Sequence, residues 1–157
     1  MMQITELGVW KAAIDLAKSC YELSQKFPEV ENFGLGYQLR STVTNIPANV
    51  SAAASRKHGK ESLRHLFRAR DMIYEVESHV YLAQKMGYIS EEELESMLES
   101  LNTSKRLLFG FIKYYKRAGS YGNKRRGRHH KHEEEEHMVT EPVGNMDDSE
   151  DEDDDEF

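Results

Sequence analysis

Apolar residues recur at steps of three and four from the beginning of the chain to about residue 115, a spacing typical of amphipathic helices. The spacing predicts four helical segments, over residues 10–27, 35–53, 66–83 and 90–115. No run of alternating apolar and polar residues indicates a strand. Because short connections between helices favour antiparallel neighbours, we predict an all-α fold, an antiparallel up-down-up-down four-helix bundle.

The third segment carries two apolar rows side by side. The first row consists of small and branched residues at seven-residue steps, namely Leu66, Ile73 and Val80 with Ala69, Val76 and Ala83. The second row is aromatic and consists of Phe67, Tyr74, Tyr81 and Tyr88. Either these rings fill the bundle core, or part of the row packs against another subunit. On the second interpretation Phe67, Tyr74 and Tyr81 are candidate oligomer-interface residues.

Charge divides the chain into three parts. The 157 residues carry 21 Lys and Arg against 28 Asp and Glu, a formal net charge of −7. Residues 1–118 are near neutral, residues 119–132 contain five Lys or Arg and no acid, and residues 133–157 contain 14 acids and no Lys or Arg. We therefore predict a bundle over 1–118, then a basic disordered arm over 119–132 and an acidic disordered tail over 133–157.

Composition and motifs exclude several classes of protein. A single Cys rules out a disulfide framework and a cysteine-based metal cluster. No apolar stretch approaches the roughly 20 residues that a membrane span needs, and the N-terminus has no secretory leader. We expect a cytoplasmic protein that does not associate with membranes. No Gly-rich phosphate loop, zinc-protease motif or nucleophile elbow is present, so we expect no enzyme, no cofactor and no metal site.

Cations gather where the third helix begins. They are Arg56, Lys57, Lys60, Arg64 and Arg68, with His58 and His65 among them. Positive charge at a helix N-terminus opposes the helix macrodipole. The fourth helix follows the opposite rule, since Ser90 and Glu93 form a capping box and acids precede cations. Since a broken local rule is where a functional site is expected, we predict that these cations contact phosphates of RNA or DNA. The alternative is an ordinary solvated face, partly paired through Glu61 with Arg64 or His65.

The predicted arm suggests a second set of phosphate contacts, formed by Lys124, Arg125, Arg126 and Arg128. Its alternative role is an inert solubilising extension. Four histidines between residues 129 and 137 suit a soft divalent metal, but nothing in the sequence orders them. The acids of 133–157 suggest regulation, because they could imitate nucleic acid and weaken its binding. Deleting them should then raise affinity at low salt.

Three stretches carry a family resemblance: LGVWKAA at 7–13, YELSQKFP at 21–28 and GLGYQLRSTVTNIPANV at 34–50. They resemble the small four-helix-bundle proteins encoded in intervening sequences of bacterial large-subunit ribosomal RNA genes, a family similar to the accessory proteins of diversity-generating retroelements. The pattern covers about residues 4–117. Its characteristic positions are matched by Gln38, Arg40, Ile46, Pro47, Asn49, Val50, Arg56 and Glu75. The chain departs from it at Ala52–Ala53 and at Asp71–Met72.

The resemblance implies a protomer that assembles into a homopentamer with a basic surface. It also implies nucleic acid, or a nucleic-acid enzyme, as the partner, without catalysis. Our preferred hypothesis is thus a non-enzymatic oligomeric module that binds nucleic acid. The alternative is a protein-interaction scaffold or an accessory subunit for an enzyme such as a reverse transcriptase.

Overall fold

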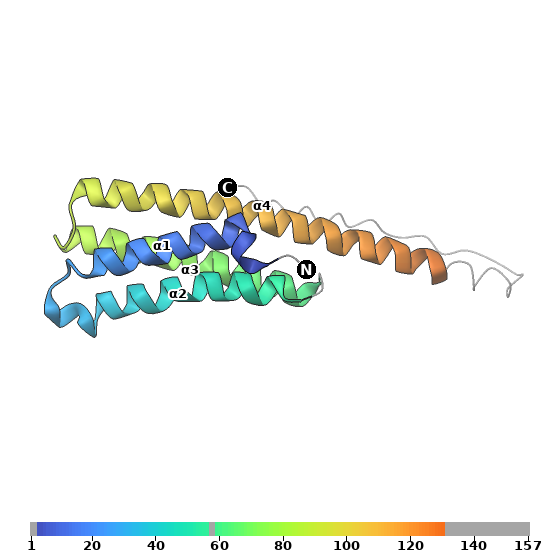
Figure 1. The fold of residues 1–157 in the computed structure, drawn as a ribbon, viewed down its shortest axis with the longest axis horizontal. Helices are drawn as coiled ribbons and strands as arrows, with labels where there is room; N and C mark the ends of the chain where they lie inside the picture. Colours follow the sequence, from blue (N-terminus) through green and yellow to red (C-terminus); the bar gives the residue numbers. More distant parts are fainter. Residues whose placement is uncertain (1–2, 57–58, 131–157) are drawn as a thin grey trace, which may run out of the picture. The chain divides into compact units, whose positions relative to one another are not determined.

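The computed structural model describes residues 3–56 and 59–130, with side chains as far as residue 119. The described part consists of helices and their connections, without a strand, which confirms the predicted all-α class (Figure 1). Four α-helices follow one another: α1 (Gly8–Ser24), α2 (Leu35–Ala54), α3 (Lys60–Lys85) and α4 (Glu91–His130). Two short 3-10 helices, η1 (Ile4–Glu6) and η2 (Glu29–Asn32), precede α1 and α2.

Contacts between helices show that neighbours run antiparallel. Between α2 and α3, Thr42 reaches Glu75 while Asn49, further along α2, reaches His65, nearer the start of α3. Between α1 and α4, Lys26 pairs with Glu93, just after α1 ends and where α4 begins. Figure 1 shows the same alternation of direction from α1 to α4. The up-down-up-down order is therefore confirmed.

The core is one apolar cluster to which all four helices contribute. On α3 it takes the whole first row, every member of which is at most 1% exposed. On α1 the spacing of three and four predicts a buried stripe that consists of Trp10, Ala13, Ala17, Cys20, Ser24 and Phe27. Four of the six are buried, but Trp10 and Ala17 are only half-buried, while Leu16 and Leu23 face the core. Pro47 is buried inside α2, which continues through it without interruption.

The aromatic row of α3 lies beside the core. Tyr74 is 39% and Tyr81 45% exposed, whereas Phe67 and Tyr88 are half-buried. The interpretation that these rings fill the core is therefore wrong for the two exposed tyrosines. These two rings stay outside the core because their row lies about 100° around the helix from Leu66, Ile73 and Val80, beyond the arc that the other helices cover.

A compact cluster of polar contacts around Glu31, in η2, joins the start of α2 to the turn that follows α3. The Glu31 carboxylate accepts hydrogen bonds from the backbone N–H of Leu35, at 2.6 Å, and from the Tyr88 hydroxyl, at 2.8 Å. Gly36 permits this approach, since a Cβ there would lie 2.7 Å from the Glu31 carbonyl oxygen. The bond to Glu31 raises the pKa of Tyr88. This cluster holds the start of α2 against the turn that follows α3, and it thereby sets the register of α2 against α3.

The last helix extends past residue 118, the predicted end of the bundle. Of the predicted arm, 119–132, the structure describes residues 119–130, and these continue α4 to His130. No proline interrupts this stretch, and its Lys and Arg residues are good helix formers that also suit a helix C-terminus. The predicted acidic tail, 133–157, lies outside the described residues. Within the described part, no helix has the length and apolar character needed to cross a membrane.

Candidate nucleic-acid interface

The cations predicted at the start of α3 form one row. Lys60, Arg64 and Arg68 follow one another at steps of four, so they lie along the outer face of the helix, and all three are exposed. None of them makes an ion pair or a side-chain hydrogen bond with another described residue. Their charges are consequently available to an external anion. We call these three residues the cationic row.

Arg56, at the end of α2, is more constrained. Its Nε lies 3.6 Å from a Glu61 carboxylate oxygen, and its Nη1 donates to the Ala52 carbonyl oxygen. The alternative of a solvated face paired Glu61 with Arg64 or His65, but Glu61 pairs with Arg56 instead. Arg56 therefore adds positive charge beside the cationic row but is partly neutralised. Lys57 and His58 lie outside the described residues.

His65 faces α2 rather than the outer face of α3 on which Arg64 and Arg68 lie. Its Nδ1 lies 3.0 Å from the Asn49 Oδ1, and the ring is half-buried between the two helices. Desolvation and the charges of Arg56, Arg68 and Arg64 lower the pKa of His65, against an opposing effect of Glu61. Three arginines thus act on one imidazole. This end of the α2–α3 pair carries a positive potential even before Lys60 is counted.

The aromatic row borders the same surface on the side of α4. Lys105 Nζ lies 4.6 Å from the centre of the Tyr74 ring, and Lys116 Nζ lies 5.7 Å from that of Phe67. Arg70 adds a guanidinium 5.0 Å from the Phe67 ring centre. Cations over aromatic faces are attracted by the ring quadrupole. The candidate interface residues Phe67 and Tyr74 therefore have charged neighbours, whereas Tyr81 has no ring or cation contact to another described residue.

Several residues that carry the family resemblance prove to be structural. Arg40 donates from Nη1 to the Ser24 hydroxyl, at 3.2 Å, and from Nη2 to the Asn32 carbonyl oxygen, at 3.1 Å. Glu75 accepts a hydrogen bond from the Thr42 hydroxyl at 3.3 Å. These bonds tie α2 to its neighbours. No pattern along the chain indicates these bonds, because each depends on the register between two helices.

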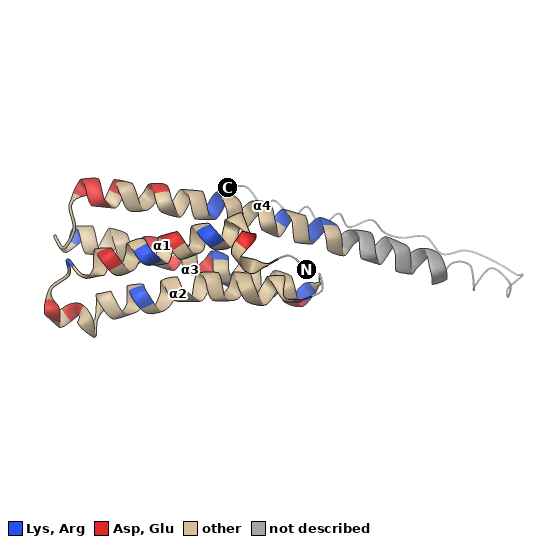
Figure 2. Cartoon of the chain, in the orientation of Figure 1, with Lys and Arg blue, Asp and Glu red and all other residues tan. Residues whose placement is uncertain are grey.

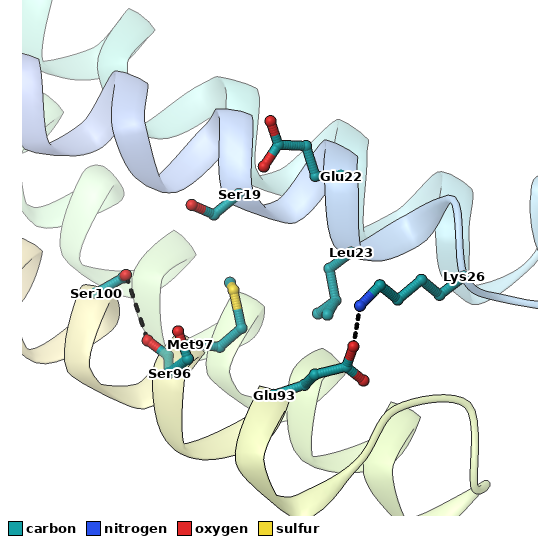
Figure 3. A pocket seen from close by; sticks show the side chains of 8 residues that line it. All are labelled: Ser19, Glu22, Leu23, Lys26, Glu93, Ser96, Met97 and Ser100. Atoms are coloured by element: carbon teal, nitrogen blue, oxygen red, sulfur yellow. Dashed lines mark hydrogen bonds and ion pairs between the residues drawn. The ribbon is translucent and has the colours of Figure 1, made fainter.

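A hollow of about 300 Å³ lies between α1 and α4, on another face of the bundle (Figure 3). Its lining includes three serines and two apolar side chains, Leu23 and Met97. Figure 3 shows the Lys26 ammonium directed at the Glu93 carboxylate, with which it forms an ion pair. Because Lys26, the one Lys or Arg in this lining, is already neutralised, the hollow is poorly suited to a phosphate.

The basic residues predicted beyond the bundle lie in the last part of α4. Residues 124–130 form a unit separate from 1–123 by their contacts, and they are helical. The side chains of Lys124, Arg125, Arg126 and Arg128 lie outside the described part. Among the described residues, no three His, Cys, Asp or Glu side chains come together as a metal site would need.

Comparison with known proteins identifies the relatives of this fold. Residues 5–110 match the family model described as 23S rRNA-intervening sequence protein. The chain belongs to this family. The match contains the start of α3 with its cationic row, and it ends before residues 124–128. The 23S rRNA-intervening sequence proteins therefore share the bundle, and the continuation of α4 lies beyond the matched region.

A solved structure supports the same assignment at the level of the fold. It is the crystal structure of a protein of unknown function from the S23 ribosomal protein family of Bacteroides thetaiotaomicron. The two chains are 23% identical, with a TM-score of 0.62, and the alignment covers 67% of this chain and 95% of the other. No curated protein matches the sequence.

Proposed function

We propose that this member of the 23S rRNA-intervening sequence family is a non-enzymatic module that binds RNA or DNA backbones. The observation that carries the proposal is the cationic row, three exposed cations without an ion partner among the described residues. They stand at a helix N-terminus, where backbone N–H groups also favour an anion. The three arginines near His65 support it, because after burial their charges contribute to the lowered pKa of His65, and a phosphate would offset those charges.

The test is the salt dependence of binding by the full chain. Each phosphate contact contributes to the slope of log K against log salt concentration, by roughly 0.7–0.9. Replacing Lys60, Arg64 and Arg68 by Ala should therefore reduce the slope by about 2–3 and lower affinity at low salt by about 100-fold.

A control variant removes the same charge elsewhere. Lys18, Lys85 and Arg106 are exposed, and none belongs to the cationic row. Their replacement by Ala should leave the slope unchanged. Equal losses in the two variants, or no binding by the natural chain at low salt, would contradict the proposal.

The proposal includes an oligomer, a homopentamer by family resemblance. The exposed rings of Tyr74 and Tyr81, on one side of α3, support contact with a second copy. Phe67 is a weaker candidate for that contact, because cations surround its half-buried ring.

One observation favours the alternative of a protein-binding scaffold. At the end of the bundle opposite the cationic row, Phe33 is 92% and Val30 78% exposed. Acidic residues gather near them, on η2 and at the start of α4 (Figure 2). An acidic surface with exposed apolar side chains suits a basic protein better than a nucleic acid. A relation to the accessory proteins of diversity-generating retroelements belongs to this alternative.

A further inference from the structure

The outer face of α3 contains a hollow of about 490 Å³ beside the cationic row. It is lined by Lys60, Leu63, Arg64, Phe67, Arg68 and Asp71. Leu63 and Phe67 are half-buried and pack against the core, so they form an apolar floor. All six residues lie on α3, and their spacing places the three cations and Asp71 to one side of Leu63 and Phe67.

This combination goes beyond what a duplex backbone requires. Phosphates of a duplex need only cations, and their bases are stacked inside the helix. An apolar floor next to cations suits a ligand that has a flat apolar body joined to a phosphate. An unstacked nucleotide of a single strand is such a ligand, and aromatic side chains are the usual platform for its base.

We infer that the hollow takes an unstacked nucleotide of single-stranded RNA or DNA, with the base against Leu63 and Phe67 and the phosphates at the cationic row. The inference rests on the proposed function and specifies its ligand. Lys116, with its ammonium 5.7 Å from the Phe67 ring centre, extends the positive surface for the neighbouring phosphates, whereas Arg70, 5.0 Å from the same centre, is ion-paired with Asp71.

Asp71 fits a nucleotide better than it fits a bare phosphate. Its Oδ1 accepts two hydrogen bonds from Arg70, from Nε and from Nη2, each at 3.2 Å. Its Oδ2 has no partner among the described residues. A carboxylate oxygen repels a phosphate but accepts a hydrogen bond from a base amino group or a ribose hydroxyl. The hollow thus offers contacts to both ends of one nucleotide.

The test compares three ligands on the full chain at one salt concentration. They are a single-stranded 20-mer of mixed sequence, its duplex, and an abasic strand with the same phosphates. We expect the single strand to bind about tenfold more tightly than the abasic strand or the duplex. RNA and DNA versions of the single strand show whether the 2′-hydroxyl contributes.

Variants assign the effect to the hollow. Phe67→Leu keeps an apolar floor but removes the ring, and it should reduce the preference for the single strand severalfold while leaving duplex affinity unchanged. Phe67→Trp retains a ring, so the preference should remain and its fluorescence should be quenched by the single strand alone. Tyr21→Leu, an exposed ring on α1 outside the hollow and outside the proposed oligomer contact, should have no effect. Thermal melting checks that each variant folds.

The outcomes separate this inference from the proposed function. Equal affinity for single strand, duplex and abasic strand, unchanged in Phe67→Leu, would overturn the nucleotide site and leave backbone binding standing. Absence of binding to all three ligands would overturn both.

Discussion

Two helices of this bundle begin in opposite ways. At α4, Ser90 and Glu93 exchange hydrogen bonds between side chain and backbone N–H, at 3.2 and 2.9 Å, and three glutamates fill the first turn. At α3 the N-cap residue is Gly59, which provides no side-chain cap, and Lys60 and Arg64 stand where acids would be favourable. Ser62, in the same turn, is buried with no hydrogen-bond partner for its hydroxyl among the described residues.

The difference shows that the start of α3 lacks the local stabilisation that the start of α4 has. Caps and first-turn acids each contribute roughly 0.3–2 kcal/mol to a helix. The start of α4 has both, as expected for a segment with a structural role. The start of α3 has only Glu61, which is engaged with Arg56. A helix start that lacks stabilising features but concentrates cations is what an anion-binding surface requires.

The largest effect is expected when the start of α3 is made to resemble that of α4. Replacing Lys60, Arg64 and Arg68 by Glu should lower affinity for nucleic acid by about 1,000-fold at low salt, because attraction becomes repulsion. Lys60→Glu alone should raise the free energy of unfolding by about 0.5 kcal/mol, since it then complements the macrodipole. Filter binding and thermal melting measure the two effects.

The matched control lies at the other end of the same helix. Lys85 occupies the last turn of α3, where a cation is favourable. Lys85→Glu should therefore destabilise the fold slightly and leave affinity unchanged. If both substitutions shift stability in the same direction, the contrast between the two ends of α3 has no basis in the macrodipole.

A smaller effect is expected at the start of α4. Ser90→Ala removes the capping hydroxyl and should cost about 1 kcal/mol of unfolding free energy, which corresponds to a melting temperature lower by about 4–6 °C. Affinity for nucleic acid should not change. Ser78→Ala is the control, because the exposed Ser78 hydroxyl donates a hydrogen bond only to the Tyr74 carbonyl oxygen within α3. Loss of affinity in Ser90→Ala would show that the start of α4 belongs to the binding surface.

Patterns within one helix were predicted well, and relations between helices were not. The capping box and the core row of α3 follow from spacing alone, and so does the exposed row of cations. On α1, the predicted stripe ran from Trp10 to Phe27 and left out Leu16 and Leu23. Only the neighbouring helices decide that Leu16 and Leu23 face the core.

The candidate site shows the same limit. The contact between Asn49 and His65 joins residues 16 positions apart in the chain, and it exists because α2 and α3 pack in one register. That register depends on the cluster of polar contacts around Glu31 and Gly36 at the other end of α2. The hollow beside the cationic row was also unpredicted, since it requires Leu63 and Phe67 to be only partly covered.

The smallest expected effect concerns pH. It separates the contribution of the α3 start to nucleic-acid binding from its contribution to folding stability. In the free protein, burial and three arginines lower the pKa of His65 from its usual 6.5. A bound phosphate neutralises those arginines, so the pKa should rise and binding should take up a proton. Affinity should then increase by roughly two- to fivefold from pH 8 to pH 6. Folding responds with the opposite sign: the unfolded chain holds this proton more readily, so the free protein should lose stability as pH falls below about 6.5.

His65→Gln should abolish the increase in affinity and reduce the loss of stability, because it keeps a polar side chain near Asn49 without a titrating group. His79→Gln is the control. Burial lowers the pKa of His79 as well, with Glu75 opposing, but His79 lies 14 residues further along α3, away from Arg56, Arg64 and Arg68. His79→Gln should also reduce the loss of stability at low pH, and it should leave affinity for nucleic acid unchanged. NMR titration of the His65 ring, free and bound, measures the shift directly. A bound pKa equal to the free one would place the phosphates away from the arginines around His65, and the start of α3 would then lack local stability for a reason other than nucleic-acid binding.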